Sequence, residues 1–261
     1  MADRIWRIEE GGGPLVATAI HDGHEVRDDA LRHMKIDEAG RLREEDPWTA
    51  GWTTVAPNRV IGLRSRFEVD LNRPRETAVY RTPEDAWGLE VWNSDPAPEI
   101  VERSLAEYDA FFEALHELYS GLAARHGRFV VYDLHTYNHR RDGPGSPEAD
   151  PRDNPQVNVG TGTMTDRKRW APVVDRFVAD LSAYDFPGGA LDVRENVRFR
   201  GGNHGRWAHE TFASSACVLS IEVKKIFMDE WTGEVDPHLL DAVGRALEST
   251  VSGILEELDN L

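Results

Sequence analysis

The sequence predicts an α/β protein, a single domain over residues 1–261 with a central mixed, mostly parallel β-sheet flanked by helices. Short apolar runs rich in β-branched residues alternate along the chain with amphipathic segments of helical period. The chain has 261 residues, of which 40% are hydrophobic, so it can bury a substantial core. Because no repeat or low-complexity linker divides it, we expect one domain.

The expected strands are short apolar runs that end at turn-forming or polar residues. Residues 14–20 end at a histidine, and residues 60–73 alternate in places and stop before Pro74. Residues 128–134 have almost no polar interruption, which is typical of a central strand covered on both faces. Two further strands are predicted at 191–199 and 216–223.

The clearest helix is predicted over residues 98–127, where apolar residues recur at helical spacing before a terminal glycine. Other helical patterns cover the charged segment 27–45, residues 167–184 and the C-terminal segment 238–261. Two segments rich in glycine, 140–163 and 201–210, are expected to be loops. A loop as long as the first is usually functional or disordered.

Composition excludes several classes of protein. The net charge of −17 argues against nucleic acid as a partner, although a small anionic substrate stays compatible with it. No apolar stretch approaches the roughly 20 residues of a membrane span, and the N-terminus lacks the apolar core of a signal peptide. The single cysteine, Cys217, indicates a buried thiol in a cytoplasmic protein. The oligomeric state is left open.

Ligands of open α/β sheets bind beyond the carboxyl ends of the strands, and polar residues follow several predicted strands here. His21 and His24 follow the first strand and are either a metal-binding pair or two solvated histidines. The 60–73 segment contributes a second group that is either an anion clamp or a set of surface salt bridges. This group comprises Arg64, Arg66, Asp70 and Arg73.

Two more candidate groups lie at the ends of the most apolar strands. Asp133, His135 and Tyr137 share one face of a strand, so Asp133 can lie behind a metal-binding His135. Glu222 stands inside an apolar run, where burial would raise its pKa toward that of a general base. The alternative is a structural ion pair with Lys224 or Lys225. Neither a phosphate-binding loop nor a GxSxG motif occurs, which disfavours a nucleotide-binding protein.

Four segments in this order resemble the N-formylglutamate amidohydrolase family, which is related to zinc carboxypeptidases and aspartoacylase. They are IHDGHE (20–25), SRFEVDLNRP (65–74), VVYDLHTY (130–137) and SIEVKKIFMDE (220–230). The last is the most specific, because the family pattern reads Ile-Glu-hydrophobic-x-Arg-x-hydrophobic-Met-Asp-Glu. The resemblance implies a zinc-carboxypeptidase-like (phosphorylase/hydrolase-like) fold that binds one Zn²⁺.

The resemblance also assigns roles to residues of this chain. His21 and His135 would be zinc ligands. The related carboxypeptidases have His-x-x-Glu where this chain has His24 in fourth place, so His24 is expected as the middle ligand. The alternatives for that ligand are Glu25, Glu45 and Asp46.

The remaining roles concern the substrate. Asn72 and Arg73 would hold a substrate carboxylate, and Arg66 would polarise the scissile carbonyl. Glu222 would activate the water. Tyr137, together with His139, would line the pocket. The two glycine-rich segments would either set the acyl specificity or be solvated loops; their candidate residues are Asn158, Thr161, Asn203, His204, Arg206 and His209.

The expected function is therefore zinc-dependent hydrolysis of the amide bond of a small N-acyl amino acid that carries a carboxylate, such as N-formylglutamate. A metallo-carboxypeptidase or an amidase of cell-wall peptides would use the same residues. A non-catalytic metal- or ligand-binding protein on this fold is a third possibility, because the His-x-x-His motif departs from the related enzymes.

Overall fold

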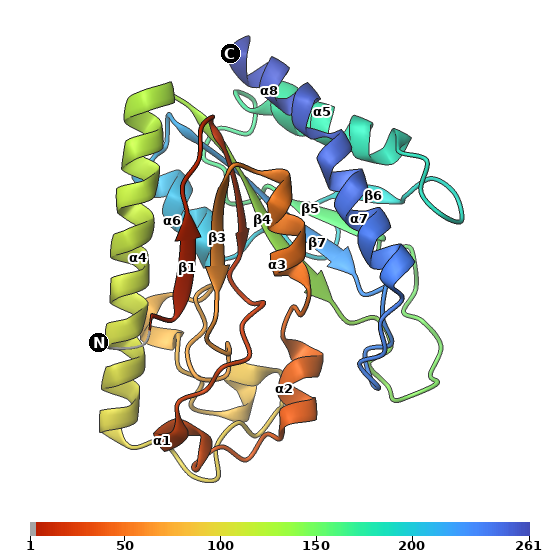
Figure 1. The fold of residues 1–261 in the computed structure, drawn as a ribbon. Helices are drawn as coiled ribbons and strands as arrows, with labels where there is room; N and C mark the ends of the chain where they lie inside the picture. The colour runs from red at the N-terminus through yellow and green to blue at the C-terminus, as the bar shows by residue number, and fades with distance from the viewer. Residues whose placement is uncertain (1–3) are drawn as a thin grey trace.

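Seven strands form one mixed sheet in the computed structural model, which describes residues 4–261 (Figure 1). Parallel pairing joins β3 to β2, β2 to β4, β4 to β7 and β5 to β6, whereas β1 and β5 pair antiparallel with β3 and β7. The predicted mixed, mostly parallel sheet is confirmed. In order across the sheet the strands are β1 (Trp6–Glu9), β3 (Asn58–Gly62), β2 (Leu15–Ala19), β4 (Phe129–Tyr137), β7 (Ala216–Lys224), β5 (Val157–Gly160) and β6 (Val193–Glu195).

Helices cover both faces of the sheet (Figure 1). On one face α4 (Pro98–His126) and α6 (Asn203–Thr211) pack against Val16, Val131 and Val218. The opposite face is covered by α3 (Thr49–Trp52), α5 (Ala171–Ala183), α7 (Pro237–Ser249) and α8 (Val251–Asp259). Two short helices, α1 (Asp28–Leu31) and α2 (Glu38–Glu44), lie beyond the ends to which the arrows of β3 and β4 point.

The central strands and the longest helix follow the sequence pattern closely. Every residue of β4 is buried, as expected for a strand with helices on both faces. Helix α4 begins at Pro98, a favoured first residue, and ends before Gly127, whose φ of 74° suits glycine. Cys217 is a buried free thiol on β7, which agrees with the expectation for it.

The strand predicted at 60–73 is too long, since β3 ends at Gly62. A Cβ atom at Gly62 would lie 2.4 Å from the carbonyl oxygen of Ile20, so the chain passes close to its neighbour here. The following segment turns repeatedly and buries polar side chains that bind other polar groups. These side chains include Ser65, Glu68 and Asp70.

Both segments expected to be loops contain regular structure. Residues 140–163 include β5, which pairs antiparallel with β7 and buries Val157 and Val159. The pairing partner is remote in sequence, so local composition did not predict it. Residues 201–210 form most of α6, which buries Ala208 against the sheet after two glycines.

Two predicted helices are interrupted, and two elements lacked a sequence signal. Segment 27–45 forms the separate helices α1 and α2, and the C-terminal pattern breaks into α7 and α8 at Thr250. The Thr250 hydroxyl bonds the carbonyl of Leu247 and the hydroxyl of Tyr132, and such bonds compete with helical ones. Strand β1 and helix α3 were not predicted.

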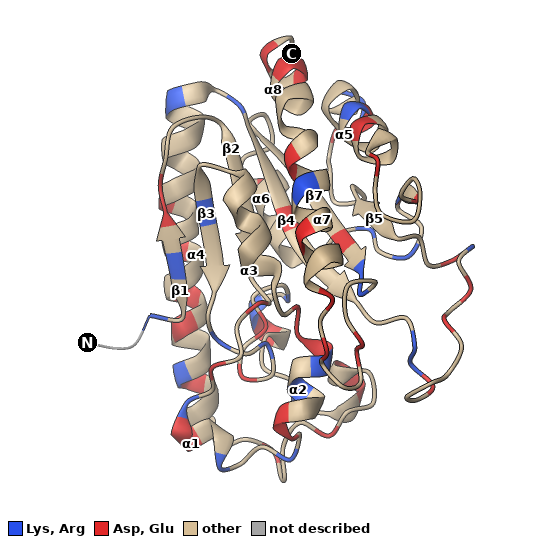
Figure 2. Ribbon diagram, turned by 45° about the vertical axis from the view of Figure 1, so that its right-hand side comes forward, with Lys and Arg blue, Asp and Glu red and all other residues tan. Residues whose placement is uncertain are grey.

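Charged side chains are spread over the outer elements, and Figure 2 shows acidic residues on α2, α4, α7 and α8. Among residues 4–261, no helix combines the length and apolarity that crossing a membrane requires.

Candidate metal centre and active site

A cavity of about 270 Å³ opens at the carboxyl ends of β2, β4 and β7. Parallel pairing brings these three ends to the same edge of the sheet. The predicted residues His21, Arg66, Asn72, His135, Tyr137 and Glu222 all line this cavity, and so does Asp46. The structure thus gathers residues from five separate sequence segments into one site.

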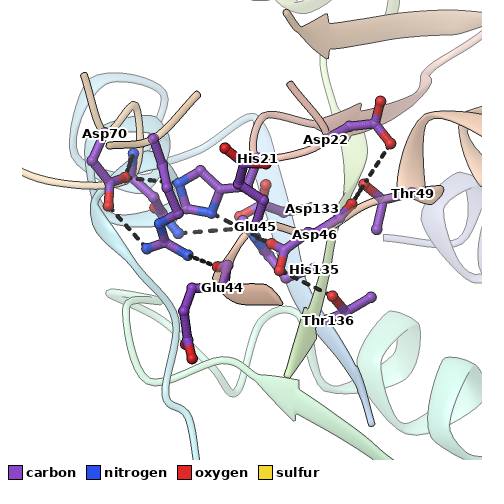
Figure 3. Close-up of polar contacts among 12 residues, drawn as sticks. His21, Asp22, Glu44, Glu45, Asp46, Thr49, Asp70, Asp133, His135 and Thr136 are labelled. Carbon is purple, nitrogen blue, oxygen red and sulfur yellow. Dashed lines mark hydrogen bonds and ion pairs between the residues drawn. The ribbon is translucent and has the colours of Figure 1, made fainter. Parts of the chain in front are cut away.

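His21, Asp46 and His135 form a buried group of potential metal ligands (Figure 3). One donor atom from each lies within 4.8 Å of the others. The Oδ2 atom of Asp46 is 3.4 Å from His21 Nδ1 and 3.0 Å from His135 Nδ1. Two imidazoles and one carboxylate are a ligand set that zinc uses when a fourth position stays open for chemistry.

The backbone explains why these three side chains meet. His21 follows the end of β2, and its carbonyl accepts a hydrogen bond of 2.9 Å from the amide of Asp46. The Asp46 carboxylate is held from its other side, because Oδ1 accepts a 3.0 Å bond from the Thr136 hydroxyl. Since Thr136 adjoins His135 on β4, this strand both supplies one potential metal ligand, His135, and orients another, the carboxylate of Asp46.

A second carboxylate lies behind each imidazole. Asp70 Oδ1 is 2.7 Å from His21 Nε2, and Asp133 Oδ2 is 3.2 Å from His135 Nε2. Carboxylates placed in this way fix the ring orientation of metal-binding histidines and raise their basicity. The expected position of Asp133 behind His135 is therefore present in the structure.

The donor set fits a cation. His21 Nδ1 is buried and has no hydrogen-bond partner, and it faces Asp46. A buried polar atom without a partner is costly, and a bound metal would satisfy it. Burial favours the protonated form of Asp46, but the hydrogen bond from His135 and the nearby imidazole of His21 hold the pKa of this carboxyl well below its usual range, so the group carries a negative charge.

Glu222 lies on β7 beside the donor group. It is the register partner of His135 and lines the same cavity. Burial raises the pKa of Glu222 to about 7, although His135 opposes the rise. Lys225 instead donates a 2.9 Å bond to the carbonyl of Glu45, and no hydrogen bond or ion pair within residues 4–261 joins Glu222 to Lys224 or Lys225.

The structure places His24, the expected middle ligand, outside the donor group. Its Nδ1 atom is 2.5 Å from Glu45 Oε2, and about a third of its side chain is exposed. Glu45 is thereby engaged, and Glu25 pairs through its backbone with the segment at Arg64. Asp46, one of the alternatives, occupies the position between the two histidines. The chain turns after His21, so the side chains of His21 and His24 diverge. Asp46 follows the end of α2 and lies next to His21.

Arg66 reaches the cavity, and Arg64 does not. The Arg66 guanidinium is 2.9 Å from Asp70 Oδ2 and lies over the ring of Trp87. Tyr80 also donates its hydroxyl proton to Asp70, so one carboxylate links His21 to Arg66. Arg64 points instead toward Glu107 on α4, at 3.2 Å.

Asn72 and Arg73 are adjacent in sequence but reach different surroundings. The Asn72 amide lines the cavity with its nitrogen 3.5 Å from His135 Nε2. Arg73 donates a 2.8 Å bond to the carbonyl of Asp85, and its Nε atom lies 3.9 Å from Asp70 Oδ2, the atom that also binds Arg66. It does not line the cavity itself. Asn72 thus lines the cavity, and Arg73 contacts a carboxylate that is bonded to His21 and Arg66. The expectation that this pair holds a substrate carboxylate stays a prediction.

Tyr137 lines the cavity with its ring against Phe199, while its hydroxyl donates to the carbonyl of Pro155. His139 lines a different cavity, where its Nδ1 atom is 3.3 Å from Glu230 Oε2. The two residues thus line different cavities, and β4 ends at Tyr137, before His139. His139 was expected in the same pocket, and this expectation is not met.

The candidate specificity residues of the two glycine-rich segments mostly support the backbone. The Asn158 side chain bonds the backbone of Arg198 and Phe199, and the His209 ring accepts a bond from the amide of Val218. The remaining candidates do not line the cavity either: Thr161, Asn203, His204 and Arg206. The cavity is instead lined by residues that sequence reasoning missed, namely Trp87, Arg141, Arg200 and Lys225.

Comparisons with known proteins concern the family and the fold of this chain. Residues 13–228 match the family described as N-formylglutamate amidohydrolase. The crystal structure of N-formylglutamate amidohydrolase from Ralstonia eutropha JMP134 is 17% identical, covers 98% of this chain and 99% of its own, and superposes with a TM-score of 0.76. A gene product of Agrobacterium tumefaciens is 14% identical, covers 98% and 96% of the two chains, and has a TM-score of 0.68.

A metallo-carboxypeptidase from Burkholderia cenocepacia is 15% identical over 94% of this chain and 56% of its own, with a TM-score of 0.34 that is too low to establish a shared fold. The comparison with curated proteins finds no match. The family match spans all the segments that supply the cavity, from His21 to Glu222. The chain therefore belongs to the N-formylglutamate amidohydrolase family.

Proposed function

We propose that this protein is a zinc-dependent amidohydrolase that cleaves the amide bond of a small N-acyl amino acid, such as N-formylglutamate. The observation that carries the proposal is the buried group of His21, Asp46 and His135, which shares one cavity with Glu222 and Arg66. The family membership supports the reaction class.

His21, Asp46 and His135 would hold the metal through the two Nδ1 atoms and one carboxylate oxygen. Nitrogen and oxygen donors of this kind suit zinc, although affinity alone would not select it over other transition metals. When bound, zinc would polarise the scissile carbonyl and lower the pKa of a water molecule. Asp70 and Asp133 would keep both rings in the orientation that this binding needs.

Glu222 would act as general base and then as general acid. Its carboxylate lies in the cavity on the strand next to His135, and within residues 4–261 it has no ion-pair partner that would hold it in the ionised form. A buried carboxyl group without such a partner can both accept and release a proton near neutral pH. It would take a proton from the attacking water and pass it to the leaving amine.

Arg66 and Asn72 would bind the substrate during the reaction. Asp70 and Tyr80 fix the Arg66 guanidinium, so it can stabilise a developing oxyanion without rearranging. The Asn72 amide, on the same side as His135, can donate to a polar group of the substrate. The cavity of about 270 Å³ is smaller than typical sites for drug-sized ligands, which favours a small substrate.

The test is hydrolysis by the zinc-loaded protein. We expect release of the free amino acid from N-formylglutamate, loss of this activity with a chelator, and its return on addition of zinc. Hydrolysis of unacylated dipeptides without deacylation would instead support a peptidase. Stoichiometric zinc binding without turnover of any N-acyl amino acid would overturn the proposal in favour of a binding protein.

A further inference from the structure

Four basic residues line the candidate cavity, and they differ in whether another group of the protein binds their side chains. Arg66 is paired with Asp70, and Lys225 donates to backbone carbonyl groups, including that of Glu45 at 2.9 Å. Within residues 4–261, the side chains of Arg141 and Arg200 form no hydrogen bond and no ion pair. Two guanidinium groups at this cavity are therefore available to a ligand.

The chain as a whole is acidic, with 47 acidic residues against 30 basic ones, and many of its arginines pair with carboxylates, as Arg75, Arg81 and Arg167 do. Arg141 and Arg200 are exposed arginines that lie at the cavity without such a partner within residues 4–261. Arginine forks that remain free at a cavity attract carboxylates and bind them through two parallel hydrogen bonds. The two positions thus form a locally basic rim on an acidic protein.

Hydrogen bonds to both the amide and the carbonyl group of Arg140 hold the backbone just before Arg141 in place. Glu230 accepts hydrogen bonds from the amides of His139, at 2.7 Å, and Arg140, at 3.0 Å. The indole of Trp231 donates a 2.8 Å bond to the carbonyl of Arg140. The long loop after β4, which carries charges of both signs at the right of Figure 2, therefore begins from a fixed point.

Arg200 is positioned by two glycines at the end of β5. A Cβ atom at Gly162 would lie 2.9 Å from Arg200 Cβ and 3.0 Å from its Nε atom, and one at Gly160 would lie 2.9 Å from its carbonyl carbon. Any larger residue at these glycines would displace the arginine. The close approach of Gly160 and Gly162 thus restrains the backbone and the side chain of Arg200, which lines the cavity.

We propose that Arg141 and Arg200 are specificity-determining residues that bind the carboxylates of a dicarboxylic N-acyl amino acid. Glu230, Trp231 and Gly162 act as positioning residues for them. The inference rests on the proposed function. Two forks on separate loops suit two carboxylates, because a single carboxylate would leave one guanidinium without a partner. Arg73, the arginine implied by the family resemblance, is bonded to the carbonyl of Asp85, lies 3.9 Å from Asp70 Oδ2 and is not among the residues that line the cavity.

The test compares N-formylglutamate with N-formylglutamine, in which a neutral amide of similar size replaces the side-chain carboxylate. We expect Arg141→Gln and Arg200→Gln each to raise KM for N-formylglutamate about tenfold, with kcat within about threefold of the wild type. One of the two variants should lose the preference for N-formylglutamate over N-formylglutamine. Arg32→Gln, which neutralises an exposed arginine outside the cavity, is the matched control.

The positioning residues have their own variants. Trp231→Phe removes only the indole donor to Arg140, and Gly162→Ala should displace Arg200. The variant that disturbs the arginine of the side-chain carboxylate should raise KM for N-formylglutamate more than KM for N-formylglutamine. The other variant should raise both KM values with kcat within about threefold of the wild type, whereas a general loss of structure would lower kcat for both substrates. If the wild type turns over N-formylglutamate but neither arginine variant changes KM, this inference is overturned while the proposed function stands. If the wild type hydrolyses no N-acyl amino acid, the proposed function fails first.

A binding measurement that does not depend on turnover further distinguishes failure of this inference from failure of the proposed function. Calorimetry with metal-free protein should show weaker binding of N-formylglutamate to Arg141→Gln and Arg200→Gln than to the wild type. Equal affinity of all three proteins, with activity present, would contradict the assignment of these residues.

Discussion

His135 on β4 and Glu222 on β7 are register partners in the parallel pair at the centre of the sheet. Both side chains line the same cavity, so one strand pairing brings a candidate metal ligand beside a candidate proton carrier. Because parallel strands keep side chains at the same level in register, neither residue can move relative to the other without breaking the ladder.

The donor group predicts which variants lose metal. Purified wild-type protein should contain about one zinc per chain, and His21→Ala, Asp46→Ala and His135→Ala should each lose it, because three protein ligands leave little binding once one is removed. His24→Ala should keep its zinc, since His24 faces Glu45 instead. Metal analysis of the four variants measures this, and zinc lost from His24→Ala with zinc retained in Asp46→Ala would reverse the assignment.

Glu222→Gln should separate chemistry from metal binding. We expect kcat for N-formylglutamate to fall by about 10²–10⁴-fold, because glutamine cannot accept the proton of the attacking water. The zinc content should stay at the wild-type level. Glu195→Gln, which makes the same change at a carboxylate paired with Arg167 outside the cavity, is the control and should retain kcat. An unchanged kcat in Glu222→Gln would remove this residue from the mechanism.

Asp133→Asn should weaken metal binding without removing a ligand. Asp133 lies 3.2 Å from His135 Nε2, and loss of such a carboxylate typically lowers metal affinity by about 10–100-fold. Competition with a chromophoric zinc chelator measures the change. Thr18→Val removes a hydroxyl that donates to the other oxygen of Asp133 at 2.7 Å, so it keeps the contact with His135 and should have a smaller effect. Equal effects of the two variants would argue against the proposed role.

His209 predicts an acid-sensitive contribution to stability. Its Nε2 atom accepts the amide proton of Val218 at 3.0 Å, so the neutral ring carries its proton on Nδ1, 3.1 Å from the Thr163 hydroxyl. Burial, and after it the charge of His204, lowers the pKa of His209 to about 4. As the pH falls, the His209 ring therefore gains its second proton at a higher pH in the unfolded chain than in the folded protein. The contribution is fully present above pH 6.5 and is lost as the pH falls toward 4, at most about 3 kcal/mol.

Urea unfolding between pH 7 and pH 4.5 tests this contribution. The free energy of unfolding should fall less steeply with pH in His209→Gln than in the wild type. His126→Gln, at an exposed position at the end of α4, should keep the wild-type slope. A wild-type slope in His209→Gln would mean that other groups cause the acid sensitivity.

Much of the fold follows from local patterns. Residues 128–134 and 216–223 are apolar enough to require burial on both faces, and each was predicted as a strand that the structure contains. The helix at 98–127 follows from its apolar period and its terminal glycine. Strand β5 and helix α6 escaped prediction, because pairing with β7 and packing against the sheet stabilise them despite their glycine-rich surroundings.

By itself the sequence determined that His21, His135 and Glu222 stand at strand ends, because each adjoins an apolar run whose burial dictates a strand. It did not determine which residue stands between the two histidines. Only the tertiary structure brings Asp46 to them while turning His24 toward Glu45 and Arg73 toward Asp85. It also brings Arg141 and Arg200, far apart in sequence, to one cavity. Strand ends are set by local hydrophobicity, whereas the path of the connecting loops depends on hydrogen bonds between remote segments.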